Sequence, residues 1–376
     1  MNVIVSTHDP LQPIHGGGAL RTLKCAEELH RRGHRVMIVA PTDGTGELSG
    51  IKVHWLHAPR KHRSQLLSSL KFNVRLLRKF LQFIRTTDVF FVHNTIAAAS
   101  LPFLKPFFPF RFVLDVTDVH AEYLRVGRPT LLERLVTPAL LQVEYWIIRA
   151  ADCVIVESRA MRRLLASHGV RDERLAVVYD GSDSAGTPAA KLPGSERTII
   201  HLGSIDKQHG VECLVRAVPL VLERHPDARF LFVGGGRLLP EVSRLAGELG
   251  VDRACVFTDF LPFAQAQTAL SQAAIGVIPR PDSLPNHIVT TLKIFEYWAS
   301  GTAVVSSRLD AIAEIAGEGR DVLFFEPGNS TDLARALIRL LEHPEQLATL
   351  RAGGLKTAAT YQWRTQIPQI IDFAVR

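Results

Sequence analysis

Residues 284–301 have the sequence Leu284-Pro-Asn-His-Ile-Val-Thr-Thr-Leu-Lys-Ile-Phe-Glu-Tyr-Trp-Ala-Ser-Gly301. Short apolar segments on either side, 274–278 and 303–306, are expected to be strands. Between them the residue spacing predicts a helix that begins near Thr290 and ends at Gly301, because glycine readily adopts the left-handed conformation that ends a helix. A helix that begins at the carboxyl end of a strand presents free N–H groups and a positive dipole end, which favour phosphate.

Two charged residues of this predicted helix are candidate site residues. Lys293 falls in the first turn, and Glu296 follows three residues later on the same face. Large apolar residues flank Glu296 in the sequence, and an unpaired carboxylate among them would be costly. We therefore expect a hydrogen-bond donor to face Glu296.

The length and composition of the chain indicate a globular protein of two domains. A chain of 376 residues is too long for one ordinary core, so each domain is expected to have fewer than 200 residues. The segment 1–8 lacks the basic start and long apolar run of a signal peptide, and we expect it to be a buried strand. The four cysteines form no CxxC pair, so neither structural zinc nor a disulfide framework is expected, and a cytoplasmic setting fits best.

Alternating strand and helix patterns predict an α/β fold with two doubly wound parallel sheets. The expected domains are 1–183 and 197–358, joined by a linker at 184–196 that is rich in turn-forming residues, and a C-terminal helix at 359–376 that crosses back to the first domain. The simplest architecture is two Rossmann-like domains that face each other across a cleft. Ligands of such sheets bind at the carboxyl ends of the strands. The predicted strands are 3–6, 35–39, 53–56, 89–93, 111–116, 153–156, 176–179, 198–202, 230–233, 256–258, 275–278, 303–306 and 322–325. Helices of the first domain are predicted near 18–32, 64–86, 130–149 and 158–168.

Three groups of glycines fall where a predicted strand gives way to a helix. They are Gly16-Gly17-Gly18, the single Gly203, and Gly234-Gly235-Gly236. None of them forms GxGxxG or a P-loop, so neither motif supports a dinucleotide or a Walker-type phosphate site. Each group alone is better explained as a tight turn. Three such groups at the mouths of two domains favour the binding of an anion or a sugar.

The net charge of +7 is concentrated in the first half of the chain, where residues 1–180 contain 25 Lys/Arg and 16 Asp/Glu. Within it, the segment 60–85 has eight Lys/Arg and no acid, and apolar residues recur at helical spacing. Such a basic amphipathic helix suits an anionic membrane surface. A crossover helix with a solvated basic face explains the pattern equally well. No nucleic-acid-binding module accompanies the charge, so nucleic acid is not an expected partner.

Asp118 and His120 follow a predicted strand of the first domain and are candidate general bases. The alternative is a loop aspartate that caps the following turn, although the neighbouring Glu122 favours function. Three further histidines, His8, His15 and His93, fall just after strands or in the glycine loop and could line an acceptor pocket. No metal-ligand spacing such as HExxH occurs, and the sequence has no DxD motif, so we expect no divalent cation to hold a nucleotide diphosphate.

Several segments, in this order, make the chain resemble a retaining glycosyltransferase of the GT-B fold, most closely glycosyltransferase family 4. The last of them, Leu292-Lys-Ile-Phe-Glu-Tyr-Trp-Ala-Ser-Gly301, is similar to the family motif KxFEYMAxGxPVV and is the most specific. The other segments that carry the resemblance are the Gly16–Gly18 turn, Ala151-Asp-Cys-Val-Ile-Val-Glu-Ser158, Val178-Tyr-Asp-Gly-Ser-Asp183, His201-Leu-Gly-Ser-Ile-Asp-Lys-Gln-His-Gly-Val211 and Phe230-Leu-Phe-Val-Gly-Gly-Gly-Arg237.

The resemblance implies a role for each of these segments. Glu296 would accept hydrogen bonds from the ribose hydroxyls of a nucleotide-sugar, and Asp118 and His120 would lie near the acceptor hydroxyl. A hexose would move to a glycan or lipid-linked acceptor with retention of anomeric configuration, without a metal and without a bound cofactor. The residues expected around the phosphates, base and sugar of the donor are Gly16, Gly17, Gly18, Gly203, Lys207, His209, Gly235, Arg237, Phe260, Leu261, Thr290, Thr291 and Lys293.

The chain departs from the family pattern at four positions. The arginine expected after Gly203 is Ser204, and the lysine expected before Gly210 is His209. The first glutamate of the Ex7E motif is replaced by Ile288, and the usual acceptor-side histidine by Thr117. Phosphate binding is then left to Lys207, Lys293, Arg237 or Arg280.

Two other functions remain open on the sequence alone. A nucleotide-sugar 2-epimerase also uses two facing α/β domains, although its motifs match less well. A catalytically inactive sugar-nucleotide-binding protein would explain the missing arginine and lysine.

Overall fold

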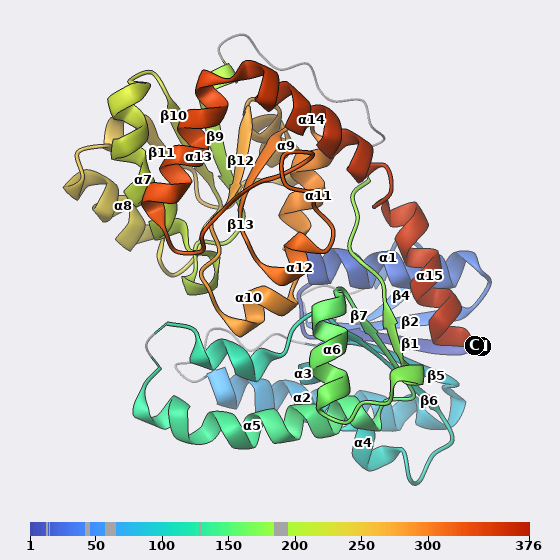
Figure 1. Ribbon diagram of the computed structural model, residues 1–376. Coiled ribbons are helices and arrows are strands. Elements are labelled where there is room, and N and C mark those ends of the chain that lie inside the picture. Colours follow the sequence, from blue (N-terminus) through green and yellow to red (C-terminus); the bar gives the residue numbers. More distant parts are fainter. Residues whose placement is uncertain (13, 15, 42–45, 57–64, 128, 184–194) are drawn as a thin grey trace. The chain divides into compact units, whose positions relative to one another are not determined.

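The computed structural model describes residues 1–376 apart from 13, 15, 42–45, 57–64, 128 and 184–194 (Figure 1). The chain forms two compact units, Met1–Tyr179 with Trp363–Arg376, and Asp180–Gln362. Three predictions fall partly or wholly outside the described residues: most of the linker 184–196, the start of the basic segment at 60–64, and His15.

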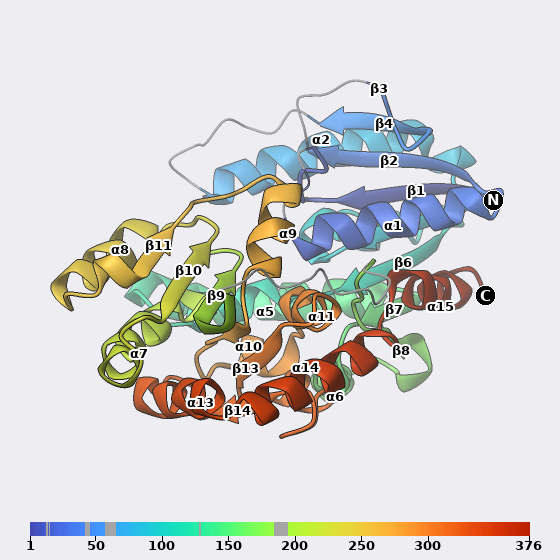
Figure 2. The same cartoon turned by 90° about the horizontal axis from the view of Figure 1, so that it is seen from above.

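The first unit is built on an eight-stranded sheet with the order β3-β4-β2-β1-β5-β6-β7-β8 (Figures 1 and 2). All pairings are parallel except that of β3 with β4. The short β3 was not predicted, because three residues that begin with glycine show no apolar alternation. The strands are β1 (Asn2–Thr7), β2 (Arg35–Pro41), β3 (Gly46–Leu48), β4 (Ile51–Leu56), β5 (Val89–His93), β6 (Arg111–Val116), β7 (Cys153–Val156) and β8 (Leu175–Val177).

Helices of the first unit connect these strands, and local sequence explains where several of them begin. In α5, Thr130 and Glu133 form a reciprocal capping box, and the Ser158 hydroxyl caps α6. The C-terminal helix α15 packs against α1, with Arg32 Nη1 donating to Asp372 Oδ1 at 2.5 Å (Figure 2). The helices are α1 (Gly17–Arg31), α2 (Gln65–Phe83), α3 (Thr95–Ala98), α4 (Leu101–Leu104), α5 (Leu131–Ala150), α6 (Arg159–Ser167) and α15 (Trp363–Val375).

The second unit has a six-stranded, fully parallel sheet with the order β11-β10-β9-β12-β13-β14. Its core is aliphatic and aromatic, and Phe230 and Phe232 of β10 are completely buried in it. The predicted class of two parallel-sheet α/β domains is therefore confirmed. The strands are β9 (Thr198–Leu202), β10 (Arg229–Val233), β11 (Cys255–Phe257), β12 (Ile275–Ile278), β13 (Ala303–Ser307) and β14 (Leu323–Phe325). The helices are α7 (Val211–Arg224), α8 (Leu239–Glu248), α9 (Phe263–Ser271), α10 (Leu284–Ile288), α11 (Leu292–Ala299), α12 (Asp310–Ala313), α13 (Ser330–Glu342) and α14 (Pro344–Ala358).

Helix α11 is the helix predicted after Thr290. Its N-cap is Thr291, and it ends just before Gly301, which has a φ of 65°. Before it stands the short α10, which was not predicted because five residues are too few to show helical periodicity. Pro285 in its first turn suits a helix start, since proline needs no hydrogen-bonded N–H there.

Within the described part of the chain, no helix is both long enough and apolar enough to cross a membrane.

Candidate functional site

The second unit has its topological switch point between β9 and β12. From β9 the chain continues to β10 and β11 on one side, and from β12 to β13 and β14 on the other. Parallel α/β sheets bind ligands just beyond the carboxyl ends of the strands at such a point. The segments concerned are 203–210, after β9, and 279–283, after β12.

Two glycine-bearing loops pack backbone to backbone at this edge. Gly203 N–H donates to Val233 O at 2.7 Å, and Ile205 N–H donates to Gly235 O at 2.8 Å. A Cβ on Gly234 would overlap the carbonyl of Gly203, and one on Gly236 would overlap that of Ile205. Tight packing therefore accounts for Gly234 and Gly236 without a ligand.

Gly203 is different because it faces a charged side chain. A Cβ there would lie 2.6 Å from Lys293 Cε and 3.0 Å from Lys293 Nζ, so the lysine side chain lies directly over the glycine. Lys293 is only 9% exposed, and its Nζ is 3.5 Å from His209 Nδ1. Burial lowers the pKa of Lys293 to about 7, and Arg280 adds to the effect while Glu296 opposes it.

Glu296 has no hydrogen-bond donor among the described residues. Its side chain keeps some exposure on the side of α11 that does not pack into the core. Burial raises the pKa of Glu296 to about 7, with Lys293 acting in the opposite direction and Asp180 reinforcing the rise. The carboxylate is thus available to a donor supplied by a ligand.

Other bases surround Lys293. His201 is buried, and burial together with Lys293 lowers its pKa to about 3. Burial also lowers the pKa of His209, with Lys293 and Arg280 contributing. Arg280, from the segment after β12, is 7% exposed. Positive and basic groups therefore outnumber acids in this cluster, an arrangement that favours an anion.

The structure brings only some of the predicted residues of the second unit together. Lys207 is exposed, and the Arg237 side chain is 87% exposed and pairs with Asp206 at 3.4 Å. Phe260 is 54% exposed with its ring against Gly235, while Leu261 is partly exposed. The residues that lie at the buried basic cluster are Gly203, His209 and Lys293, and Thr290 and Thr291 are buried just before α11.

A second polar cluster lies at the switch point of the first unit, between β1 and β5. His8 and Asp9 follow β1, and His93 ends β5. The glycine turn at 16–18 belongs here, because a Cβ on Gly18 would lie 2.6 Å from His93 Nε2 and 2.7 Å from Asp9 Oδ2.

Beneath this cluster lies a fully buried ion pair that the sequence analysis missed. Arg21 Nε and Nη2 donate to Asp115 Oδ2 and Oδ1 at 2.8 and 2.9 Å, and His93 Nδ1 is 3.1 Å from Asp115 Oδ2. Although burial opposes it, the charge of Arg21 and the bond to His93 hold the pKa of Asp115 well below its usual range.

Glu144 of α5 organises the predicted acceptor side and was also missed. Its carboxylate accepts hydrogen bonds from the backbone N–H groups of His120 and Ala121, both at 2.9 Å, and from the Thr95 hydroxyl at 2.5 Å. Glu122, whose place near His120 favoured a functional cluster, is buried and pairs with Arg125 at 3.1 Å. The sequence signal for Glu144 was available: like Glu296, it is one acid within an apolar helical run.

The charges on this side separate the two candidate bases. Burial opposes protonation of His120, but Glu144 and Asp118 raise its pKa above the usual value. Burial lowers the pKa of the adjacent His8, whose ring centre is 5.1 Å away, to about 4. Asp118 accepts a hydrogen bond from the Tyr123 hydroxyl at 2.6 Å. The raised pKa makes His120 easier to protonate, and a protonated imidazole cannot accept a proton from a hydroxyl group.

The described residues contain no group of three or more His, Cys, Asp or Glu side chains that could hold a metal ion.

Comparison with known proteins assigns both halves of the chain. Residues 15–185 match the domain described as Glycosyltransferase Family 4, and residues 196–343 match Glycosyl transferases group 1. The chain is 28% identical over 250 residues to 2-deoxystreptamine glucosyltransferase of Streptomyces kanamyceticus, a match that covers 62% of this chain and 63% of that protein, less than two thirds of its length. It is 25% identical over 377 residues to phosphatidyl-myo-inositol mannosyltransferase of Mycolicibacterium smegmatis, covering 95% of this chain and 89% of that protein.

Solved structures share the fold. Sucrose-phosphate synthase from Thermosynechococcus elongatus matches with a TM-score of 0.83 and 20% identity, covering 99% of this chain and 98% of that chain. Anabaena HepE, in complex with UDP and glucose, matches with a TM-score of 0.79 and 17% identity over 99% and 98% of the two chains. With glycosyltransferase domains matched in both halves and parallel α/β sheets of the GT-B type in both units, the chain belongs to the family 4 glycosyltransferases.

Proposed function

We propose that this protein transfers a hexose from a nucleotide-sugar to a glycan or lipid-linked acceptor, with retention of anomeric configuration and without a metal. The observation that carries the proposal is the buried basic cluster around Lys293, with the unpaired Glu296 one helical turn away. Cations suit a diphosphate, and a carboxylate without a partner suits ribose hydroxyls. HepE, which shares the fold, was solved with UDP and glucose, and the mannosyltransferase relative has a lipid named in its substrate.

The chemistry follows from where charge develops. As the bond between the sugar and the diphosphate breaks, negative charge grows on the leaving phosphate, and preorganised cations stabilise it. In retention by same-face attack, the acceptor oxygen bonds to the anomeric carbon on the side that the phosphate leaves, and a phosphate oxygen helps to take the hydroxyl proton. No second carboxylate is then needed as a nucleophile, in contrast to retaining hydrolases. In the first unit, Asp118 is the group best suited to accept a hydrogen bond from the acceptor hydroxyl and so to orient it.

A screen of nucleotide-sugars tests the proposal. We expect one of them to raise the melting temperature, because a ligand that binds only the folded state stabilises it. Sugar should then reach an added acceptor, with the same anomeric configuration as in the donor. An epimerase would convert the nucleotide-sugar with no acceptor present, and an inactive binding protein would show the thermal shift without turnover. Either outcome would contradict the proposal.

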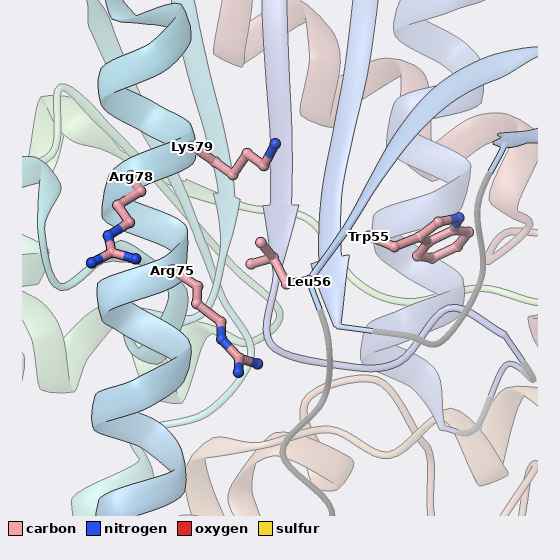
Figure 3. A pocket seen from close by; sticks show the side chains of 5 residues that line it. All are labelled: Trp55, Leu56, Arg75, Arg78 and Lys79. Atoms are coloured by element: carbon pink, nitrogen blue, oxygen red, sulfur yellow. The ribbon is translucent and has the colours of Figure 1, made fainter.

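We further propose that helix α2 binds an anionic membrane surface, which would bring the protein to a lipid-linked acceptor. A pocket of about 360 Å³ lies where α2 passes the end of β4, and Leu56, Arg75 and Lys79 line it together with Trp55 and Arg78 (Figure 3). Figure 3 shows Arg75 and Lys79 extending from α2 toward Leu56, while Arg78 and the indole of Trp55 point elsewhere. No acid is among the described residues that line this pocket, and Val74 and Leu81 are exposed on the same helix. Exposed apolar groups beside cations suit a lipid surface.

Co-sedimentation with vesicles measures this contact. We expect the wild type to bind phosphatidylglycerol vesicles at low salt, to release them at high salt, and to ignore phosphatidylcholine vesicles. The double variant Arg75→Glu/Lys79→Glu should bind at least about tenfold more weakly, since each basic residue contributes about 1 kcal/mol. The matched control is Arg216→Glu/Arg253→Glu, which makes the same charge change at exposed positions of the second unit. Equal loss in both variants, or no binding by the wild type, would contradict the role of α2.

A further inference from the structure

Arg280 is a buried cation, and no carboxylate among the described residues forms an ion pair with it. Its Nη1 donates to Val289 O at 3.2 Å, while its Nε is buried and has no hydrogen-bond partner among the described residues. No carboxylate of the described residues lies within the 4.0 Å of an ion pair. Leaving a charged group buried and unpaired costs several kcal/mol. A protein keeps such a group where a ligand supplies the opposite charge.

The surroundings of Arg280 add positive character. Its charge contributes to the lowered pKa values of Lys293 and His209. A Cβ on Gly210 would overlap the carbonyl of Pro279, so the loop after β9 packs against the segment that carries Arg280. The nearby acid, Glu296, interacts with Lys293 and Asp180.

We propose that Arg280 binds the diphosphate of the donor and supplies the permanent positive charge for its departure. The arginine expected after Gly203 is Ser204 in this chain, so that position does not supply this charge. The inference rests on the proposed function, because it assigns a residue to the same site. Burial distinguishes Arg280 from two of the other three candidates for phosphate binding. Lys207 and Arg237 are exposed, whereas Arg280 and Lys293 are buried.

The two buried cations are not equivalent. An arginine stays charged at any physiological pH, while Lys293, with a pKa of about 7, loses its proton near neutral pH. With Nη1 held by Val289 O, the guanidinium still offers Nε–H and Nη2–H on one edge. Two parallel N–H groups of this kind match two phosphate oxygens, so lysine cannot fully replace the arginine.

The experiment compares ligands that differ only in phosphate. Affinities of the wild type, Arg280→Gln and Arg280→Lys are measured for uridine, UMP and UDP, for the guanosine series, and for pyrophosphate. The control is Arg244→Gln, an exposed arginine of α8 that pairs with Glu248. We expect Arg280→Gln to weaken diphosphate and pyrophosphate binding by about 100-fold and to leave nucleoside binding unchanged, as for truncation of one partner of a buried charge pair. The diphosphate affinity of Arg280→Lys should lie between those of the wild type and Arg280→Gln. Arg244→Gln should bind as the wild type does.

Each alternative outcome overturns at least one of the two proposals. If Arg280→Gln binds diphosphates as the wild type does, or weakens nucleosides and diphosphates equally, Arg280 does not bind phosphate. If Arg280→Gln does not fold, the comparison of Arg280→Lys with the wild type decides in the same way. If the wild type binds pyrophosphate through Arg280 but neither nucleoside diphosphate, the anion site stands and the proposed donor is wrong. If it binds none of these probes, both proposals fail.

Discussion

Lys293→Met is expected to lower kcat/KM for sugar transfer by about 100- to 1,000-fold, the range found when a preorganised transition-state donor is removed. The lysine ammonium lies against Gly203 in a site of low exposure, where a fixed charge acts strongly on a leaving phosphate. Methionine has a similar length and no charge, so the substitution removes the cation and keeps the packing. The assay is transfer from the nucleotide-sugar that gives the thermal shift.

The pH profile of kcat/KM adds a second readout for the same variant. Burial raises the pKa of Glu296 to about 7 and lowers that of Lys293 to about 7. The rate should fall below neutral pH as Glu296 gains a proton, and above it as Lys293 loses one, with apparent values that belong to the pair. Lys293→Met should remove the alkaline decline. Lys356→Met, the same change at an exposed position of α14, serves as the control and should leave rate and profile unchanged. Full activity of Lys293→Met would show that the assigned donor site is wrong.

The parts of the fold that sequence predicted are those set by local patterns. Strands such as β7 and β12 are continuous apolar runs, and their predicted limits agree with the structure. Lys293 and Glu296 could be linked because three residues separate them on one helix. The missed elements include β3, α3, α4 and α10, which have only three to five residues and are too short to show a period.

The rest of the candidate sites depends on contacts between residues far apart in the chain. Arg21 and Asp115 are 94 residues apart, and Thr95 and Glu144 are 49 apart, so no local pattern joins them. Sequence also could not rank the four possible phosphate-binding cations, because it does not show that Arg237 points into solvent while Arg280 is buried. A buried cation interacts more strongly with an anion than an exposed cation does, because the dielectric constant is lower in the interior.

The largest stability effect is expected at the buried pair of the first unit. Arg21→Leu should lower the free energy of unfolding by about 3–5 kcal/mol, because it leaves the Asp115 charge buried without its partner. The double variant Arg21→Leu/Asp115→Leu should recover much of the loss, since replacing both charges with apolar groups is often close to neutral. Urea unfolding followed by circular dichroism measures both variants.

The size and pH dependence of its stability effect should distinguish the buried Arg21–Asp115 pair from an exposed ion pair. Arg162→Leu breaks the exposed pair with Asp172 and should cost no more than about 1 kcal/mol. Because the folded-state pKa of Asp115 is lowered, its contribution is complete above the unfolded value of about 4 and is lost as the pH falls through the folded value. The stability difference between the wild type and the double variant should therefore shrink on acidification from pH 7 toward pH 2. If Arg21→Leu cost no more than Arg162→Leu, or if that difference did not change with pH, the pair would not be the buried electrostatic support of the first unit that its geometry indicates.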